Sequence, residues 1–307
     1  MLESPTFDLI SIGELLIDMV SSNYAEDLSQ ADTYHRIPGG SPANMAGNLV
    51  RLGKKAALVA SVGTDEAGRF LRSHVGKLGL DVSRVRNVPE PTTLILVTKS
   101  RTVSNFEAYR SADKAISLAQ TDIDWICQAK VMHTTAFALS REPARTSILT
   151  AADQACYAGV QASIDANYAT KIWPDRPEAI SVIGQYLRHG ALAKFSEVDY
   201  QRLFAEPVVD PVKAGERIRE LGAKLVCLTM GEQGVYVVSN EGDFHLEARP
   251  VEVKDTTGAG DAFWAGFLSA WLEERSLIQC ARAGRALAEM KLGFLGPLPD
   301  RVSLLEE

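Results

Sequence analysis

The sequence predicts an α/β protein: a doubly wound, mostly parallel sheet with helices on both faces, together with a small β-sheet lid. Short apolar runs alternate with longer stretches of helical period, the pattern required by parallel strands that crossover helices join. Two segments, 14–38 and 91–111, instead alternate with period two and contain no long helix. At 307 residues, the chain is long enough to bury a large core.

Buried strands of the core are expected at 8–13, 56–63, 130–139, 160–167, 191–195 and 224–230. A hairpin over 234–248, with its turn at 240–243, extends the sheet. The lid, built from antiparallel strands, comprises 14–38 and 91–111 and is therefore discontinuous in the chain. The α/β core comprises 1–13, 39–90 and 112–307.

Two helices have clear start and stop signals. Ser41 is the expected N-cap of the first, Pro42 takes its first position, and Gly53 follows its last periodic residue. The second helix is expected to open near Ser140 and to stop at Gly159. Both follow a predicted strand or turn, as crossover helices do.

Composition excludes several classes of protein. With 46% hydrophobic and 23% charged residues, the chain is neither disordered nor fibrous. Lys plus Arg number 32 and Asp plus Glu number 39, which gives a net charge of −7 and disfavours a nucleic-acid partner.

The cysteines and the N-terminus indicate the compartment. Cys127, Cys156, Cys227 and Cys280 form no CxxC pair, so reduced thiols rather than disulfides or a zinc site are expected. The N-terminus lacks the basic start of a signal peptide, and no apolar run reaches the length of about 20 residues that a membrane span needs. We therefore expect a cytoplasmic protein without a membrane partner.

The most informative segment is DTTGAGD, residues 255–261, because a helix of apolar period follows it. The amides of Gly258, Ala259 and Gly260 then lie unpaired at the positive end of the helix dipole and form a cradle for an anion. A glycine-rich helix start with Asp261 complementing the dipole is the structural alternative. The clustering of threonines, glycines and an acid favours a phosphate site. No Walker A loop occurs, and Phe263 stands where a dinucleotide fingerprint has its third glycine.

The segment PGGSPANMAGN, residues 38–48, is a second candidate site. Gly39 and Gly40 let a backbone turn approach a ligand, and Asn44 and Asn48 share one helix face. Amides that both donate and accept suit sugar hydroxyls, although a turn followed by a solvated face is an equally good reading.

Asp165 and Asn167 end a predicted strand, at the edge where parallel sheets bind ligands. The alternative is a local turn role. The site reading is favoured.

Together the GGSPAN and DTTGAGD segments resemble the two signatures of the pfkB (ribokinase-like) carbohydrate kinase family. Four further segments resemble the family in the expected order: VGTDEAGRF (62–70), SIDANYATKIW (163–173), AKFSEVD (193–199) and TMGEQGVYV (229–237). GGSPAN and YRSADKA (109–115) are most similar to fructokinases. The resemblance implies an ATP-dependent sugar kinase that uses Mg²⁺. Among such kinases, it favours a fructokinase. A kinase of 2-keto-3-deoxygluconate or 5-dehydro-2-deoxygluconate is the alternative within the class. An NAD-dependent oxidoreductase and a noncatalytic sugar or nucleotide sensor are the alternatives outside it.

The resemblance also implies roles for matching residues. Asp261 is the catalytic base, and the amides of 258–260 receive the transferring phosphoryl group. The sugar contacts it implies are Asp18, Gly39, Gly40 and Asn44, with Arg110 reaching in from the lid. The ATP contacts are Lys194, Ser196, Thr229, Gly231 and Gly234.

The implied ion sites and partners are less specific. Asp199 or Glu197 holds Mg²⁺ through water, and Asp255 with Thr257 matches a loop that binds a monovalent cation such as K⁺. Ala169 replaces an Arg common in relatives, which disfavours a carboxylated acceptor. The partner is a small-molecule sugar, and the lid is a candidate surface for a homodimer.

Overall fold

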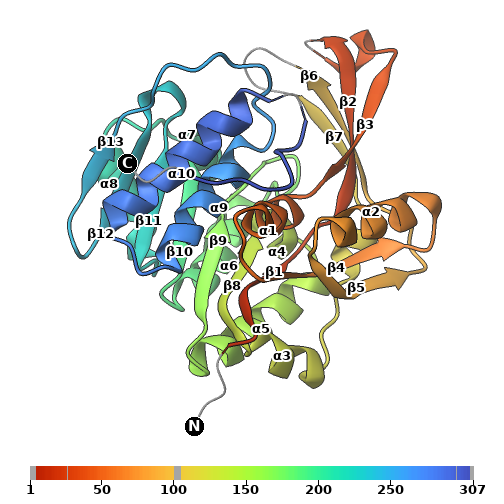
Figure 1. The fold of residues 1–307 in the computed structure, drawn as a ribbon, viewed down its shortest axis with the longest axis horizontal. Helices are drawn as coiled ribbons and strands as arrows, with labels where there is room; N and C mark the ends of the chain where they lie inside the picture. Colours follow the sequence, from red (N-terminus) through yellow and green to blue (C-terminus); the bar gives the residue numbers. More distant parts are fainter. Residues whose placement is uncertain (1–4, 26, 100–104, 295, 305–307) are drawn as a thin grey trace.

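The computed structural model describes residues 5–25, 27–99, 105–294 and 296–304. These residues form a nine-stranded sheet in the order β13-β12-β11-β10-β9-β8-β1-β4-β5 (Figure 1). Every pair from β11 across to β5 is parallel, and β12 and β13 add an antiparallel hairpin at one edge. The strands are β1 (Phe7–Ile12), β4 (Ala56–Gly63), β5 (Asp81–Val88), β8 (Ala129–Thr135), β9 (Gln161–Asp165), β10 (Leu192–Ser196), β11 (Leu225–Thr229), β12 (Val235–Ser239) and β13 (Phe244–Leu246). The predicted mostly parallel sheet and its hairpin are confirmed.

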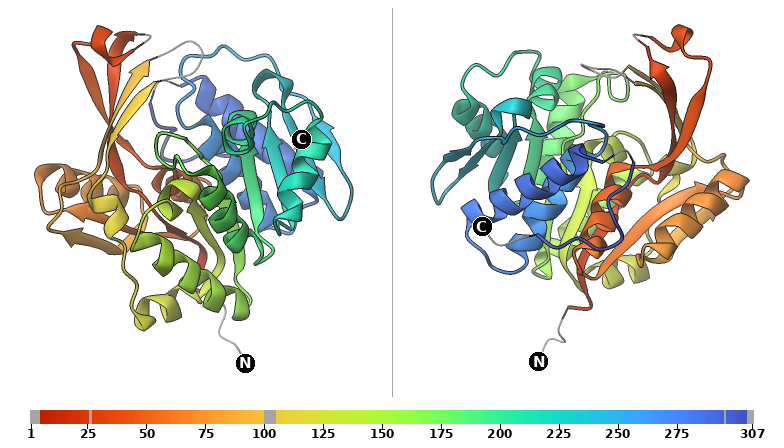
Figure 2. Two further views of the ribbon diagram at one scale, coloured as in Figure 1. Left: turned by 180° about the vertical axis from the view of Figure 1, so that it is seen from behind. Right: turned by 45° about the horizontal axis from the view of Figure 1, so that its top comes forward.

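Helices cover both faces of this sheet, as Figure 2 shows from two sides. One face packs against α1 (Ser41–Arg51), α2 (Glu66–Lys77), α9 (Ala259–Trp271) and α10 (Leu277–Leu292). The other packs against α3 (Gln120–Ile126), α4 (Ala136–Leu139), α5 (Ala144–Tyr157), α6 (Arg176–Leu187), α7 (Glu197–Phe204) and α8 (Pro211–Glu220). Successive side chains of β1 point to opposite faces of the sheet. Leu9 packs in the hydrophobic cluster on the face covered by α1 and α9, whereas Ile10 and Ile12 pack in the cluster on the other face.

Three local predictions were wrong. Strand β8 ends at Thr135, because the Thr135 hydroxyl accepts the amide of Ala138 and caps the short helix α4. The following helix begins at Ala144 rather than near Ser140. The N-cap of α1 is Gly40 and not Ser41, whose hydroxyl donates elsewhere.

A separate four-stranded sheet, in the order β3-β2-β6-β7, rises from the core (Figure 1). Its strands are β2 (Leu16–Tyr24), β3 (Tyr34–Gly39), β6 (Leu94–Lys99) and β7 (Phe106–Tyr109). We expected antiparallel strands throughout, but the central pair of β2 and β6 is parallel. Strand β2 follows β1 and strand β6 follows β5, and both core strands end at the same edge of a parallel sheet. Strands β2 and β6 therefore leave the core in the same direction, and β3 and β7 run back toward it.

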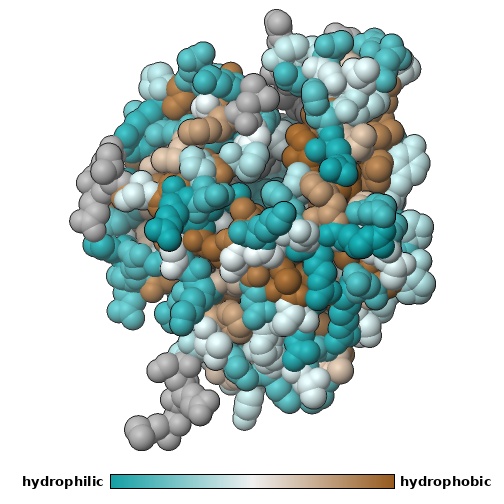
Figure 3. Space-filling view, turned by 45° about the vertical axis from the view of Figure 1, so that its right-hand side comes forward, coloured by the Kyte–Doolittle hydropathy of each residue, from teal (hydrophilic) through white to brown (hydrophobic). Residues whose placement is uncertain are grey.

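Hydrophobic side chains gather on the surface of the small sheet and at its junction with the core (Figure 3). Part of its apolar surface is buried, since Leu16 and Ile95 pack with Phe137 and Ile172 of the core. None of the described helices is long and apolar enough to cross a membrane. The four cysteines are free thiols, as predicted.

Glu14 lies buried in the link between the two sheets. Its Oε2 accepts the hydroxyl of Thr135 at 2.9 Å, and burial raises its pKa to about 8. Its backbone oxygen lies against Gly40, where a Cβ would come within 2.2 Å. Gly40 also has a φ of 106°. The turn that brings β3 into α1 therefore needs glycine, both for this backbone conformation and because no Cβ fits there.

We predict that Glu14→Gln stabilises the protein at alkaline pH. The folded pKa near 8 lies above the ordinary 4.5, so folding favours the protonated acid. Its contribution to stability is complete below about pH 4.5 and is lost as the pH rises through 8. Glutamine keeps an oxygen for Thr135 and cannot ionise. The melting temperature of the variant should match the wild type at pH 5 and exceed it at pH 9.

Glu66→Gln is the control, because the Glu66 side chain is 90% exposed and should change neither value. Melting curves of Glu14→Gln and wild type that coincide from pH 5 to 9 would show that Glu14 does not titrate in this way.

Candidate active site

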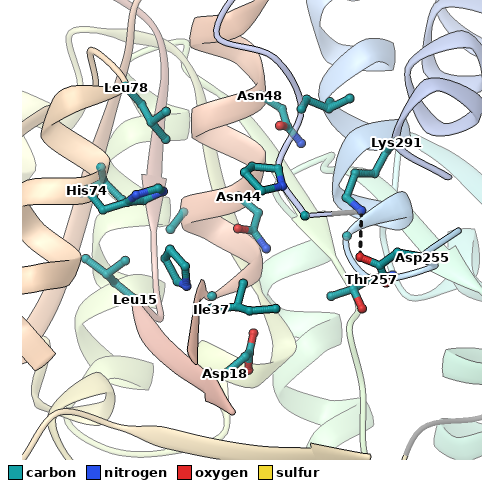
Figure 4. Close-up of a pocket in the computed structure, with 18 of the residues that line it drawn as sticks. Leu15, Asp18, Ile37, Asn44, Asn48, His74, Leu78, Asp255, Thr257 and Lys291 are labelled. Carbon is teal, nitrogen blue, oxygen red and sulfur yellow. Dashed lines mark hydrogen bonds and ion pairs between the residues drawn. The ribbon is translucent and has the colours of Figure 1, made fainter. Parts of the chain in front are cut away.

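An open pocket lies where β2 and β3 meet the start of α1 and the segment before α9 (Figure 4). Asp18 comes from β2, Asn44 and Asn48 come from one face of α1, and Lys291 contacts Asp255 on one side of the pocket. Four segments far apart in the chain thus bring polar side chains together at one edge of the large sheet. This is the edge at which the parallel strands end, as expected for an α/β site.

Asp261 lies in the first turn of α9 and is 9% exposed. The Ser41 hydroxyl donates to its Oδ1 at 2.6 Å, and the Asn44 amide donates to its Oδ2 at 2.9 Å. Burial raises the pKa of Asp261, while these two donors oppose the rise. Asp261 is therefore a buried, oriented carboxylate that donors help to keep ionised.

Ser41 is a site residue that the sequence analysis missed, since it was assigned only as a helix cap. Ser41 and Asn44 lie three residues apart and so share one face of α1. That spacing was the available signal. Their partner, 217 residues beyond Asn44, was not visible in the sequence.

The start of α9 presents amides to solvent, though not the three that we predicted. The Ala259 amide donates to the Thr256 carbonyl at 3.2 Å, so it is already paired. The amides of Gly258, Gly260 and Asp261 have no acceptor among the described residues. Gly258 has a φ of 75°, the left-handed conformation that suits glycine at this N-cap. The candidate anion cradle thus consists of the amides of Gly258, Gly260 and Asp261, with Asp261 in place of Ala259.

Lys194 and Asp165 form a buried ion pair beside this cradle. Lys194 Nζ lies 3.1 Å from both carboxylate oxygens, and the side chains are 8% and 3% exposed. Burial raises the pKa of Asp165, and the opposite charge of Lys194 works against that rise. A Cβ on Gly260 would come within 2.8 Å of Lys194 Nζ, so the ammonium lies directly at the start of α9.

Asp18 lies over Gly39, its neighbour in the small sheet. A Cβ on Gly39 would come within 2.0 Å of Asp18 Oδ2, so only glycine leaves room for this carboxylate. Burial, and next the charge of Asp261, raise the pKa of Asp18 to about 7. The Asp18 carboxyl group, on the small sheet, and the Asp261 carboxyl group, in the core, therefore lie close enough for their charges to interact.

Arg110 and Asn167 do not reach the pocket as predicted. The Arg110 guanidinium donates to Asp113, Ser140 and the Phe137 carbonyl, which ties it into the junction below the small sheet. Asn167 is exposed and has a φ of 35°, and its amide donates to Asp165 Oδ1. Asn167 thus fulfils the local turn role that we had considered the alternative.

The predicted ATP contacts lie at the ends of β10 and β11, but two have structural tasks. Ser196 caps α7 with Asp199. A Cβ on Gly234 would meet the Leu246 carbonyl at 2.1 Å, so this glycine allows the hairpin to close. Thr229 and Gly231 line the same end, and no atom lies within 4 Å of a Cβ built on Gly231.

Of the two candidate carboxylates for Mg²⁺, Glu197 fits better. Both oxygens of Asp199 already accept hydrogen bonds, from the Tyr168 amide and from Ser196, and Asp199 is 6% exposed. Glu197 is partly exposed and has no side-chain partner among the described residues. A single carboxylate suits Mg²⁺ bound mainly by phosphate oxygens and water.

The predicted K⁺ site does not fit. Asp255 Oδ1 accepts the Thr257 amide at 2.9 Å, and Oδ2 accepts Lys291 Nζ at 3.3 Å (Figure 4). Burial alone would raise the pKa of Asp255, but the Thr257 hydrogen bonds and the charge of Lys291 lower it overall. The Lys291 ammonium therefore already pairs with the Asp255 carboxylate that K⁺ was expected to bind.

A family model described as "pfkB family carbohydrate kinase" matches residues 6–297. The ATP-dependent 6-phosphofructokinase of Thermoanaerobacterium thermosaccharolyticum is 34% identical over 294 residues, covering 96% of this chain and 90% of the relative. Fructokinase-1 of Oryza sativa subsp. japonica is 32% identical over 313 residues, covering 97% and 96%.

Solved structures agree with these relatives. The fructokinase of Halothermothrix orenii matches with a TM-score of 0.78 at 32% identity, covering 94% of this chain and 98% of that one. An uncharacterised sugar kinase from Pyrococcus horikoshii in complex with ATP matches with a TM-score of 0.81 at 26% identity, covering 94% and 93%.

We predict strong energetic coupling between Lys194 and Asp165. Each single change, Lys194→Met or Asp165→Asn, leaves a buried group without its main partner and should lower the free energy of unfolding by about 3–5 kcal/mol. The double variant removes both and should lose much less than the sum of the single losses. Urea unfolding followed by circular dichroism measures all three.

The Lys130 and Asp8 pair, with side chains 45% and 20% exposed, is the matched control, and its coupling should stay within about 1 kcal/mol. If the Lys194 and Asp165 losses simply add, the pair does not act as a unit.

Proposed function

Because the chain belongs to the pfkB family of carbohydrate kinases and so transfers phosphate to a sugar, we propose that its acceptor is fructose and its donor ATP. The observation that carries the proposal is the Asp261 carboxylate, held by Ser41 and Asn44 at the start of α9 and facing Asp18. This arrangement places a base, groups that bind hydroxyls and an anion cradle beside one pocket, which Asp18, Asn44 and Gly258 line. Phosphoryl transfer requires such positioning and charge stabilisation.

Asp261 acts as the general base in this proposal. Burial makes its carboxylate more basic than an exposed one, while the Ser41 and Asn44 donors keep it available in the ionised form. It accepts the proton of the sugar hydroxyl as that oxygen bonds to the γ-phosphorus of ATP, while the bond from this phosphorus to the β,γ-bridging oxygen breaks and ADP leaves. The free amides of 258, 260 and 261 and the Lys194 ammonium then stabilise the charge on the phosphoryl oxygens.

Mg²⁺, with Glu197 as its protein carboxylate, would neutralise charge on the phosphates of ATP. Thr229 and Gly231 are the predicted contacts of the nucleotide at the end of β11. The small sheet serves as a lid that excludes water from the closed site. A homodimer through the hydrophobic surface of this lid and a cytoplasmic location stay predictions (Figure 3).

The acceptor is proposed to be a neutral sugar rather than a sugar acid. Two basic residues are engaged with other groups: Arg110 with Asp113, and Lys171 with Asn105, Glu107 and the Phe106 carbonyl. Within the pocket, Lys291 pairs with Asp255. Asp18 lines the pocket and Asn44 joins Asp261 to it, so this side supplies acid groups rather than a cation for another carboxylate. Several relatives named fructokinase support a ketohexose.

A second candidate acceptor is fructose 6-phosphate. It is favoured by the relative at 34% identity named ATP-dependent 6-phosphofructokinase. The basic residues Arg51 and His74 also line the far wall of the pocket.

We predict that Asp261→Asn lowers kcat by about 100-fold or more, the usual scale of general-base catalysis, while ATP still binds. Asparagine keeps the shape of the side chain and cannot take the proton. Steady-state kinetics give kcat, and calorimetric titration with ATP gives Kd. Asp153→Asn, at a side chain that is 74% exposed, is the control and should leave both unchanged. A variant that retains more than a tenth of the wild-type kcat would exclude Asp261 as the base.

We predict that fructose has the highest kcat/KM in a panel with fructose 6-phosphate, 2-keto-3-deoxygluconate and 5-dehydro-2-deoxygluconate. Arg110 and Lys171 are engaged with other groups, so the two acids should fall about 10- to 100-fold below fructose. Coupled ADP release at fixed ATP and Mg²⁺ measures all four. A higher value for fructose 6-phosphate selects the second candidate, and a higher value for either acid overturns the proposal of a neutral acceptor.

A further inference from the structure

Lys291 is a buried cation that lines the active-site pocket and takes no part in the reaction proposed above. It is the penultimate residue of α10 and is 7% exposed. Its Nζ lies 3.3 Å from Asp255 Oδ2, and its Cε would lie 3.7 Å from a Cβ on Gly258. Its charge also acts to lower the pKa of Asp261. The ammonium thus sits among the groups that open α9 (Figure 4).

The packing of α10 against α9 brings Lys291 to this place. A Cβ on Gly266 would come within 2.5 Å of the Ala283 carbonyl, and one on Gly284 within 2.8 Å of the Phe263 carbonyl. The two helices therefore cross in close contact, which only glycine permits. The end of α10 then lies beside the start of α9, where a lysine also complements the negative end of its own helix.

Lys291 and the end of α10 hold the segment before α9 in place. The amides of Lys254 and Asp255 both donate to the Leu292 carbonyl, at 2.8 and 3.4 Å. The side chain of Asp255 continues the connection, because it accepts Lys291 on one oxygen and the Thr257 amide on the other. This chain of contacts leads from α10 directly to Gly258, the N-cap of α9.

We infer that Lys291 is a positioning residue: its ammonium is the permanent counter-ion of Asp255, fixes residues 255–258 and makes a bound K⁺ unnecessary. A second cation beside an ammonium that already contacts the carboxylate is repelled. The inference rests on the proposed function only in that the fixed amides receive the phosphoryl group. The fixed loop and the absence of a K⁺ requirement follow from the ion pair itself.

The decisive variant is Lys291→Met, which keeps the apolar stem and removes the charge. In wild type, the melting temperature and kcat should be the same in KCl and in tetramethylammonium chloride of equal ionic strength. In Lys291→Met, Asp255 loses its counter-ion and K⁺ can replace it. K⁺ should then raise the melting temperature by about 2 °C or more, because an ion that binds only the folded state stabilises it.

The same variant should lose about 10-fold or more in kcat in tetramethylammonium and recover several-fold of it in K⁺. A residue that merely fills space would give a loss that K⁺ does not restore. Lys291→Arg keeps a cation and should show no response to K⁺. Lys54→Met breaks the ion pair of Lys54 with Glu273, outside this pocket, and is the control that should also show none.

Should Lys291→Met fail to fold, the double variant Asp255→Asn/Lys291→Met removes the unpaired carboxylate and should fold without responding to K⁺. A wild type whose melting temperature depends on K⁺ overturns the inference, and so does a folded Lys291→Met that behaves alike in both salts. The melting measurement needs no sugar, so its result stands apart from the identity of the acceptor.

Discussion

The active site depends on one constraint: the Asp261 carboxylate is buried where two helices begin. A buried carboxylate needs donors, and here Ser41 and Asn44 of α1 supply them to the first turn of α9. The two helices are therefore bound to each other at their starts. The free amides of α9, the turn at Gly40 and the carboxyl group of Asp18 then take fixed places around that point. Displacement of either helix would separate the Asp261 carboxylate from its donors Ser41 and Asn44.

The charges around this point are carboxyl groups and ammonium groups in close contact. Asp18, Asp165 and Asp261 have pKa values raised chiefly by burial, whereas that of Asp255 is lowered. Lys194 and Lys291 are buried with Asp165 and Asp255 as partners. The ammonium groups lie at the start of α9 beside their partner acids, and Asp18 lies on the small sheet.

The small sheet places Asp18 through its topology. Two strands leave the core in the same direction, pair in parallel and return separately to α1 and to the junction at Arg110. Arg110, with Asp113 and Ser140, closes the base of this sheet, and Glu14 lies buried in the link beside it. A residue that sequence comparison assigns to substrate is here part of the support of the sheet that carries Asp18.

The sequence by itself determined the parallel sheet and its hairpin and singled out the two glycine-rich segments, because these depend on local periodicity and on residue types within one short segment. Only the tertiary structure decided the partners. The local sequence predicts a helix cap at Ser41, and the family resemblance implies a sugar contact for Arg110. Nothing in the sequence distinguishes Lys291 from any other lysine at a helix end. Each acts through a residue elsewhere in the chain, Asp261, Asp113 and Asp255 respectively. Such contacts arise from the packing of whole helices, which local pattern does not encode, and packing therefore decided which charges face one another.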